Sequence, residues 1–170
     1  MQETGKRDPR LERMIFFADA VFAFALTLLA LEIRLPPGLG EGEFWPALAA
    51  LGPQIGAFAI SFALAGLWWL VHLAATRELA MFDWPTAICH LVFLVFIVLV
   101  PFAASTFGAN ILNNDALALY WLINAGASIA MTLMWWVMSR GGGRLLIGGI
   151  SGGERLLRLF NPSPQALFSC

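Results

Sequence analysis

Four long apolar runs, separated by short polar segments, dominate the sequence. They lie near residues 14–33, 48–74, 86–107 and 116–138. A membrane-spanning helix needs about 20 predominantly apolar residues, and each run is long enough. The pattern therefore predicts an all-α integral membrane protein: a multi-span helical bundle with four transmembrane helices.

Composition supports this class and excludes others. The chain is 59% hydrophobic and 12% charged, whereas soluble domains carry about 25% charged residues. Its two cysteines, Cys89 inside an apolar run and Cys170 at the last position, suggest neither a disulfide nor a metal site. P-loop, Rossmann and HExxH patterns are absent, as is a serine, histidine and acid arrangement for hydrolysis. We expect no enzyme activity, no cofactor, no bound metal and no nucleic-acid partner.

Basic residues predict the orientation of the spans. Of the ten, four precede the first run, four follow the last, Arg34 lies between the first two runs and Arg77 between the second and third. A cytoplasmic N-terminus places all but Arg34 inside, as the positive-inside rule demands. The first run lacks a small-residue cleavage site, so we interpret it as a retained span rather than a signal peptide. Residues 1–140 are then the transmembrane domain, followed by a cytoplasmic or interfacial tail at 141–170.

Asp19 lies inside the first apolar run, where an aspartate at mid-bilayer costs about 2.5 to 3.5 kcal/mol. One explanation is that it caps the first turns of the helix, at the positive end of the dipole. The other is that it pairs with polar groups on other helices. Trp69 and His72 share one face of the second span, and His90 begins the third at similar depth. We expect these residues and Arg13 to form one polar cluster, although each histidine can instead be an isolated, hydrogen-bonded core residue.

The stretch RMIFFADAVFAFALTLLALEI, residues 13–33, resembles the first helix of the transmembrane protein 175 family of potassium channels. That family's signature is R-x-x-x-F-S-D, followed by an apolar helix that ends in Leu-Glu-Ile. Arg13, Phe17 and Asp19 match the signature, and Ala18 replaces its serine.

Two later segments extend the resemblance over about residues 10–140. Trp69 and His72 resemble the family's W-x-x-H at the end of its second helix, and HLVFLVFIVLVPF (90–102) resembles its third helix. The resemblance implies that the signature residues pack against helices two and three and hold helix one in place. Asp19 would then be a structural anchor rather than an ion ligand.

The resemblance also implies that helix one lines a pore in a homotetramer. Phe24, Leu28 and Leu31 align with the family's hydrophobic constriction, and Thr27 aligns with its pore-facing threonine. Without the resemblance, a stripe at this spacing would be interpreted as lipid-facing or packing, because every nearby position is apolar.

A departure from the family concerns the number of spans. Its repeat has six, whereas only four are legible here, so 141–170 can also be read as a truncated remnant of the last two helices. A TVGYG-like filter and a voltage-sensing arginine ladder are both absent. We expect a tetrameric, potassium-permeable channel of the bacterial inner membrane, with the hydrophobic constriction as its gate and selectivity element. Its partners would be lipid, potassium ions and other copies of the chain.

The alternative function is a haem-binding membrane electron carrier. His72 and His90 are placed near the same ends of adjacent antiparallel helices, and two such histidines can hold a haem as axial ligands. The spacing permits this function, but no other redox feature accompanies it.

Overall fold

The computed structural model describes residues 8–140, and within them it contains five α-helices and no strand. Four helices are long: α1 (Pro9–Leu31), α3 (Gly52–Arg77), α4 (Trp84–Ala109) and α5 (Asn114–Met138). The short α2 spans Phe44–Ala50. Each of the four long helices has the length and apolar composition to cross a membrane. The predicted multi-span helical class is confirmed, whereas the predicted tail at 141–170 lies outside the described residues.

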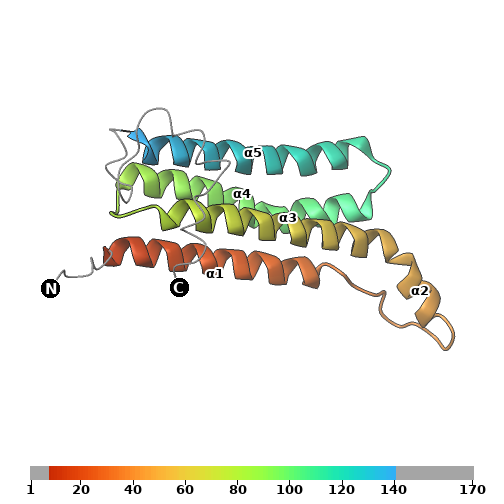
Figure 1. The fold of residues 1–170 in the computed structure, drawn as a ribbon. Coiled ribbons are helices and arrows are strands. Elements are labelled where there is room, and N and C mark those ends of the chain that lie inside the picture. Colours follow the sequence, from red (N-terminus) through yellow and green to blue (C-terminus); the bar gives the residue numbers. More distant parts are fainter. Residues whose placement is uncertain (1–7, 141–170) are drawn as a thin grey trace.

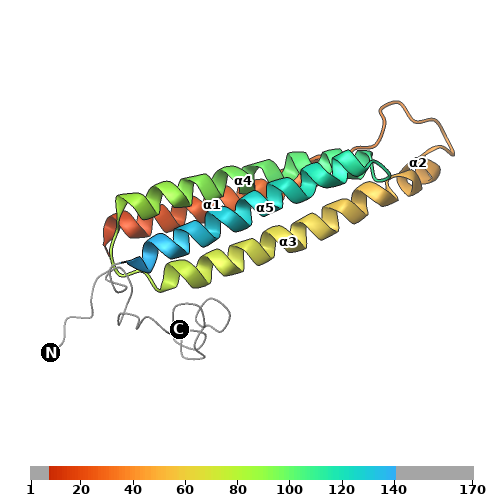
Figure 2. The same cartoon turned by 90° about the horizontal axis from the view of Figure 1, so that it is seen from above.

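The long helices lie side by side in one elongated bundle, and successive helices run in opposite directions (Figures 1 and 2). The start of α1, the end of α3, the start of α4 and the end of α5 therefore share one end of the bundle. Helix α4 packs against α1, α3 and α5. This arrangement makes α4 the central helix and leaves one side of α1 without a neighbour.

Local sequence signals set where the helices begin. Asp8 caps α1, and its carboxylate accepts a hydrogen bond of 2.9 Å from the backbone N–H of Arg10. Asp83 caps α4 and Asn113 caps α5 in the same manner. Proline also occupies the first turn of α1, α3 and α4, where its missing N–H costs nothing.

The second span differs from its predicted bounds. The apolar pattern predicts a helix over 48–74. In the structure, α2 ends at Ala50 and α3 begins at Gly52, so the helix is interrupted at Leu51. Pro53 fits the first turn of a new helix and not the interior of a continuous one. Residues 44–46, which precede the predicted second span, are the start of α2, and Trp45 there is 73% exposed.

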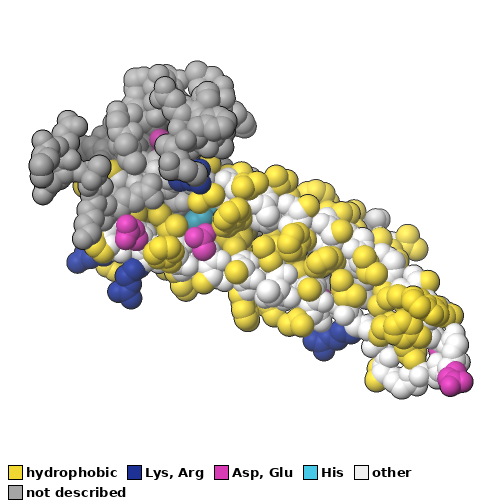
Figure 3. Space-filling view, turned by 60° about the horizontal axis from the view of Figure 1, so that its bottom comes forward, with side chains coloured by type: hydrophobic (Ala, Val, Ile, Leu, Met, Phe, Trp, Pro, Cys, Tyr) yellow, Lys and Arg dark blue, Asp and Glu magenta, His cyan; other side chains and the backbone are white. Residues whose placement is uncertain are grey.

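Two apolar clusters fill the bundle. The cluster at the end that holds the start of α1 includes Phe22, Phe93 and Met134, and the cluster nearer the other end includes Leu29 and Val100. Helices α4 and α5 are in close contact at Gly126, where an added Cβ would overlap the ring of Phe96. Apolar side chains also cover much of the outside, and charged ones gather towards the ends of the face in Figure 3. A bilayer is the environment that suits such a surface.

Candidate functional site

Helix α1 has two different faces. One face is buried in the bundle through Leu11, Ala18, Phe22, Ala25 and Leu29. The opposite face carries large apolar side chains that stay exposed, among them Phe16, Phe17, Phe24 and Leu31. The described part of the chain offers no partner to this outward face of α1.

The predicted pore residues lie on or beside the outward face. Phe24 is 64% exposed and Leu31 is 61% exposed, and they stand two helical turns apart on one stripe. Leu28 is half-buried and Thr27 is exposed. The Thr27 hydroxyl donates a hydrogen bond of 2.7 Å to the backbone carbonyl of Phe24, so its oxygen retains accepting capacity towards a cation.

Asp19 pairs with a residue of another helix. The indole Nε1 of Trp69, on α3, donates a hydrogen bond of 2.9 Å to Oδ1 of Asp19. The N-terminus of α1 is capped by Asp8 instead. The capping explanation for Asp19 is therefore wrong, and the contact joins α1 to α3.

The other two signature residues do not join this contact. Arg13 and Phe17 are exposed, and no hydrogen bond or ion pair links Arg13 to another residue between 8 and 140. Ala18, at the position of the family's serine, is fully buried against the bundle. Within this chain the five expected polar residues thus form two separate pairs, with Arg13 outside both.

The second pair is formed by His72 of α3 and His90 of α4. Their Nε2 atoms are 2.8 Å apart, and the rings are stacked with an interplanar angle of 13°. The side chains are 1% and 0% exposed, and the rings of Phe22 and Phe93 pack against His72. In both imidazoles Nδ1 is buried without a hydrogen-bond partner among the described residues. One Nε2–H···Nε2 bond between neutral rings accounts for the short distance.

This geometry does not fit the haem alternative. Two metal–nitrogen bonds of about 2 Å each would hold the two nitrogens about 4 Å apart, whereas the Nε2 atoms contact each other directly at 2.8 Å. The two side chains are buried, and the rings of Phe22 and Phe93 pack against His72.

Two polar contacts between α3 and α5 involve residues that were not among the predicted site residues. The hydroxyl of Ser61 donates to the hydroxyl of Tyr120 at 3.1 Å, and Nε1 of Trp68 donates to Oδ1 of Asn124 at 3.4 Å. An asparagine in the middle of a span needs a polar partner. Asn124 was therefore a signal that the sequence offered.

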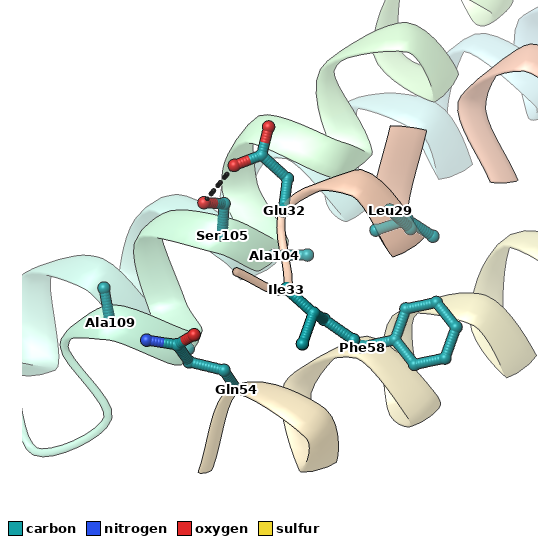
Figure 4. A pocket seen from close by; sticks show the side chains of 9 residues that line it. Leu29, Glu32, Ile33, Gln54, Phe58, Ala104, Ser105 and Ala109 are labelled. Carbon is teal, nitrogen blue, oxygen red and sulfur yellow. Dashed lines mark hydrogen bonds between the residues drawn. The ribbon is translucent and has the colours of Figure 1, made fainter. Parts of the chain in front are cut away.

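A further missed contact lies where α1 ends. The hydroxyl of Ser105, on α4, donates a hydrogen bond of 2.8 Å to Oε2 of Glu32, directly after α1 (Figure 4). A groove opens beside it between the end of α1, the start of α3 and the end of α4. Leu29, Gln54 and Ala109 each contribute to its walls from one of these helices. We refer to it as the Glu32 groove.

Comparison with known proteins points to one family. The model of the family described as "Endosomal/lysosomal potassium channel TMEM175" matches residues 13–101. A potassium channel from Streptomyces collinus is 33% identical over 135 residues, 76% of this chain and 65% of that protein. A potassium channel from Chryseobacterium is 26% identical over 122 residues, 72% of this chain and 62% of that protein. The chain thus spans less than two thirds of the length of these relatives.

A solved structure shares the fold. The crystal structure of a lysosomal potassium-selective channel TMEM175 homolog from Chamaesiphon minutus superimposes with a TM-score of 0.71 at 22% sequence identity. The superposition covers 95% of this chain and 81% of the other. The helical arrangement described above is therefore that of a known membrane protein.

Proposed function

This chain belongs to the TMEM175 family, whose model matches residues 13–101, and we propose that it forms a potassium-permeable channel. The observation that carries the proposal is the outward face of α1: an apolar stripe on a membrane helix whose other face is packed in the bundle. The potassium channels among its relatives support the choice of ion. A family described as a channel also agrees with the expectation that the chain is not an enzyme.

Four copies of the chain would bring their α1 helices together around one axis. Phe24, Leu28 and Leu31 would then form apolar layers that narrow the pore, because each lies on or beside the outward face of α1. Water leaves such a constriction readily, and an ion must shed part of its hydration to pass. The layers would thus act as gate and selectivity element, with the Thr27 oxygen available to a partly dehydrated potassium ion.

The polar pairs would hold the pore helix rather than carry ions. Asp19 is bonded to Trp69 on the packed side of α1, and His72 and His90 are enclosed in the bundle. Neither pair lies on the outward face. The roles of Arg13 and Phe17 in the signature stay predictions, because both are exposed and have no polar partner within the described chain.

The charges support a cytoplasmic N-terminus. Among the described residues, Arg10, Arg13, Arg77 and Arg140 lie at the end of the bundle where α1 begins, and Arg34 alone lies at the other end. This asymmetry follows the positive-inside rule. Together with the relatives from bacteria, it supports a location in the bacterial inner membrane.

Flux of potassium into liposomes that contain the purified full chain tests the proposal, with the mass of the assembly measured in the same preparation. We expect a tetramer that admits potassium, and empty liposomes that do not. A confirmed tetramer without flux would overturn the channel. Flux from a monomer or dimer would overturn the tetrameric pore.

A further inference from the structure

The Glu32–Ser105 contact fixes the end of α1 that follows the predicted constriction. Glu32 is the C-cap residue of α1, where the negative end of the helix dipole disfavours an acid. The helix itself therefore gives no reason for a carboxylate here. The hydrogen bond of 2.8 Å from Ser105 on α4 supplies that reason, because a hydroxyl bonded to a carboxylate is a strong, directional contact.

Beside this contact, the Glu32 groove borders the last turn of α1, where Leu29 is buried in the bundle and Glu32 is exposed. The groove has an empty volume of about 390 Å³, part of which is open to the surroundings. Leu29 and Phe58 give it apolar walls, as Figure 4 shows. Apolar walls that close on each other bury further apolar surface and gain dispersion contacts.

The wall opposite α1 is rigid. An added Cβ on Gly108 of α4 would lie 3.1 Å from the Cβ of Ala57 and 3.3 Å from the Cα of Gln54, both on α3. Helices α3 and α4 are thus already in tight contact at the floor of the groove. A movement that closes the groove therefore falls to the end of α1, and it would carry α1 away from its outward face.

We propose that Glu32 is a positioning residue of the pore: its hydrogen bond to Ser105 acts as a strut that keeps the last turn of α1 from withdrawing into the Glu32 groove. This inference rests on the proposed function, because the strut would set the width of the pore at the apolar layers of Leu28 and Leu31. Without the strut, α1 closes the groove and its outward face retreats, so the neck of the pore widens.

Three variants of the full chain separate the hydrogen bond from the charge. Ser105→Ala removes the donor and keeps the carboxylate, whereas Ser105→Thr keeps the donor. Glu32→Gln removes the charge but retains an oxygen that accepts from Ser105. Hydrogen–deuterium exchange of residues 29–33, measured on the purified protein in detergent, reports the last turn of α1 directly. Liposome flux of potassium and sodium reports the pore.

We expect Ser105→Ala to speed exchange at 29–33 by about fivefold, the factor that one net hydrogen bond is worth, and to leave exchange near Asp19 unchanged. Potassium and sodium flux should both rise, with weaker discrimination between them. Ser105→Thr should match the wild type, and Glu32→Gln should change exchange and flux less than Ser105→Ala, because its amide oxygen still accepts from Ser105 in a weaker, uncharged bond. If Glu32→Gln alters flux while Ser105→Ala does not, Glu32 acts through its charge and the strut is overturned. Unchanged exchange in Ser105→Ala overturns it as well.

Filling the groove gives an independent test. Ala109→Leu adds a side chain to the groove wall, so it should oppose withdrawal of α1 and cancel the rise in flux when combined with Ser105→Ala. Ala118→Leu, at an exposed α5 position outside the groove, is the matched control. Combined with Ser105→Ala, it should leave the rise in flux unchanged. Equal effects of the two leucines would overturn the proposal. A wild-type chain that carries no ions would overturn the channel itself, while the exchange measurement would still decide whether the strut exists.

Discussion

Trp69 donates a hydrogen bond of 2.9 Å through Nε1 to Oδ1 of Asp19. This bond joins α1, the helix proposed to line the pore, to α3. The contact explains how an acid is accommodated inside an apolar helix: it has a donor at its own depth in the membrane. At the C-terminal end of α1, Glu32 and Ser105 make a comparable contact with α4. Helix α1 is therefore held by one acid near its middle and one at its C-terminal end, on the sides turned away from its outward face.

Removal of the donor should destabilise the fold. We expect Trp69→Phe to lower the free energy of unfolding by about 1 to 2 kcal/mol, because the Asp19 carboxylate keeps its desolvation cost and loses its partner. An unfolding titration in mixed micelles measures the difference. Trp121→Phe, which replaces an exposed indole of α5, is the control and should cost much less. Equal losses in the two variants would show that the Asp19 bond contributes nothing.

The histidine pair should behave as a unit. His72→Phe or His90→Phe alone leaves the remaining imidazole buried without a partner, at an expected cost of about 1 to 3 kcal/mol. The double replacement removes both polar rings from an apolar setting, so it should cost clearly less than the sum of the single variants. A double-mutant cycle on unfolding free energies checks this. Additive losses would mean that the 2.8 Å contact does not couple the two residues.

The positions of the spans could be predicted because run length and hydropathy decide membrane insertion. The break at Leu51 is absent from the hydropathy pattern, since α2 and α3 are both apolar and continuous in the sequence; Pro53 is the residue that signals it. The two faces of α1 could not be predicted from the sequence. Almost every residue between 14 and 31 is apolar, so periodicity cannot tell Phe22, which is buried, from Phe24, which is exposed.

The candidate site was predictable where a polar residue is out of place. Asp19 inside a span calls for a donor, and matching depth on the neighbouring helices indicates Trp69, His72 and His90. It does not show that these residues form separate pairs, because pairing depends on helix rotation. Glu32 and Ser105 gave no such signal. A glutamate just beyond a helix end and a serine in a span are both ordinary, and 73 positions separate them along the chain.

Cysteine labelling tests the topology. In a background with Cys89 and Cys170 replaced by alanine, Glu41→Cys should react with a membrane-impermeant thiol reagent only from outside the cell. Met81→Cys, in the link between α3 and α4, should react only after the reagent reaches the cytoplasm. The two sites lie at opposite ends of α3, so the same access at both would contradict the four-span topology. If Glu41→Cys reacted only from the cytoplasm and Met81→Cys only from outside, the orientation in the membrane would be the opposite of the predicted one.

Thr27 should affect selectivity more than flux. Thr27→Val keeps the shape of the side chain and removes the oxygen that a partly dehydrated ion can contact. We expect the ratio of potassium to sodium flux to fall while total flux changes little. The matched control is Thr132→Val on α5, whose exposed hydroxyl likewise bonds to its own helix. An equal effect of the control, or none of Thr27→Val, would remove Thr27 from the ion path.

Whether the outward face of α1 lines the ion pathway is tested most directly by the flux of a Phe24→Ala variant. Phe24 is 64% exposed, so its truncation should leave the fold and the proposed tetramer intact while it opens one apolar layer of the proposed constriction. Phe62→Ala removes the same ring from an exposed face of α3 and serves as the control. The account predicts higher flux with weaker discrimination between potassium and sodium for Phe24→Ala, and wild-type behaviour for Phe62→Ala. Unchanged flux through an intact Phe24→Ala tetramer, or the same rise in Phe62→Ala, would contradict it.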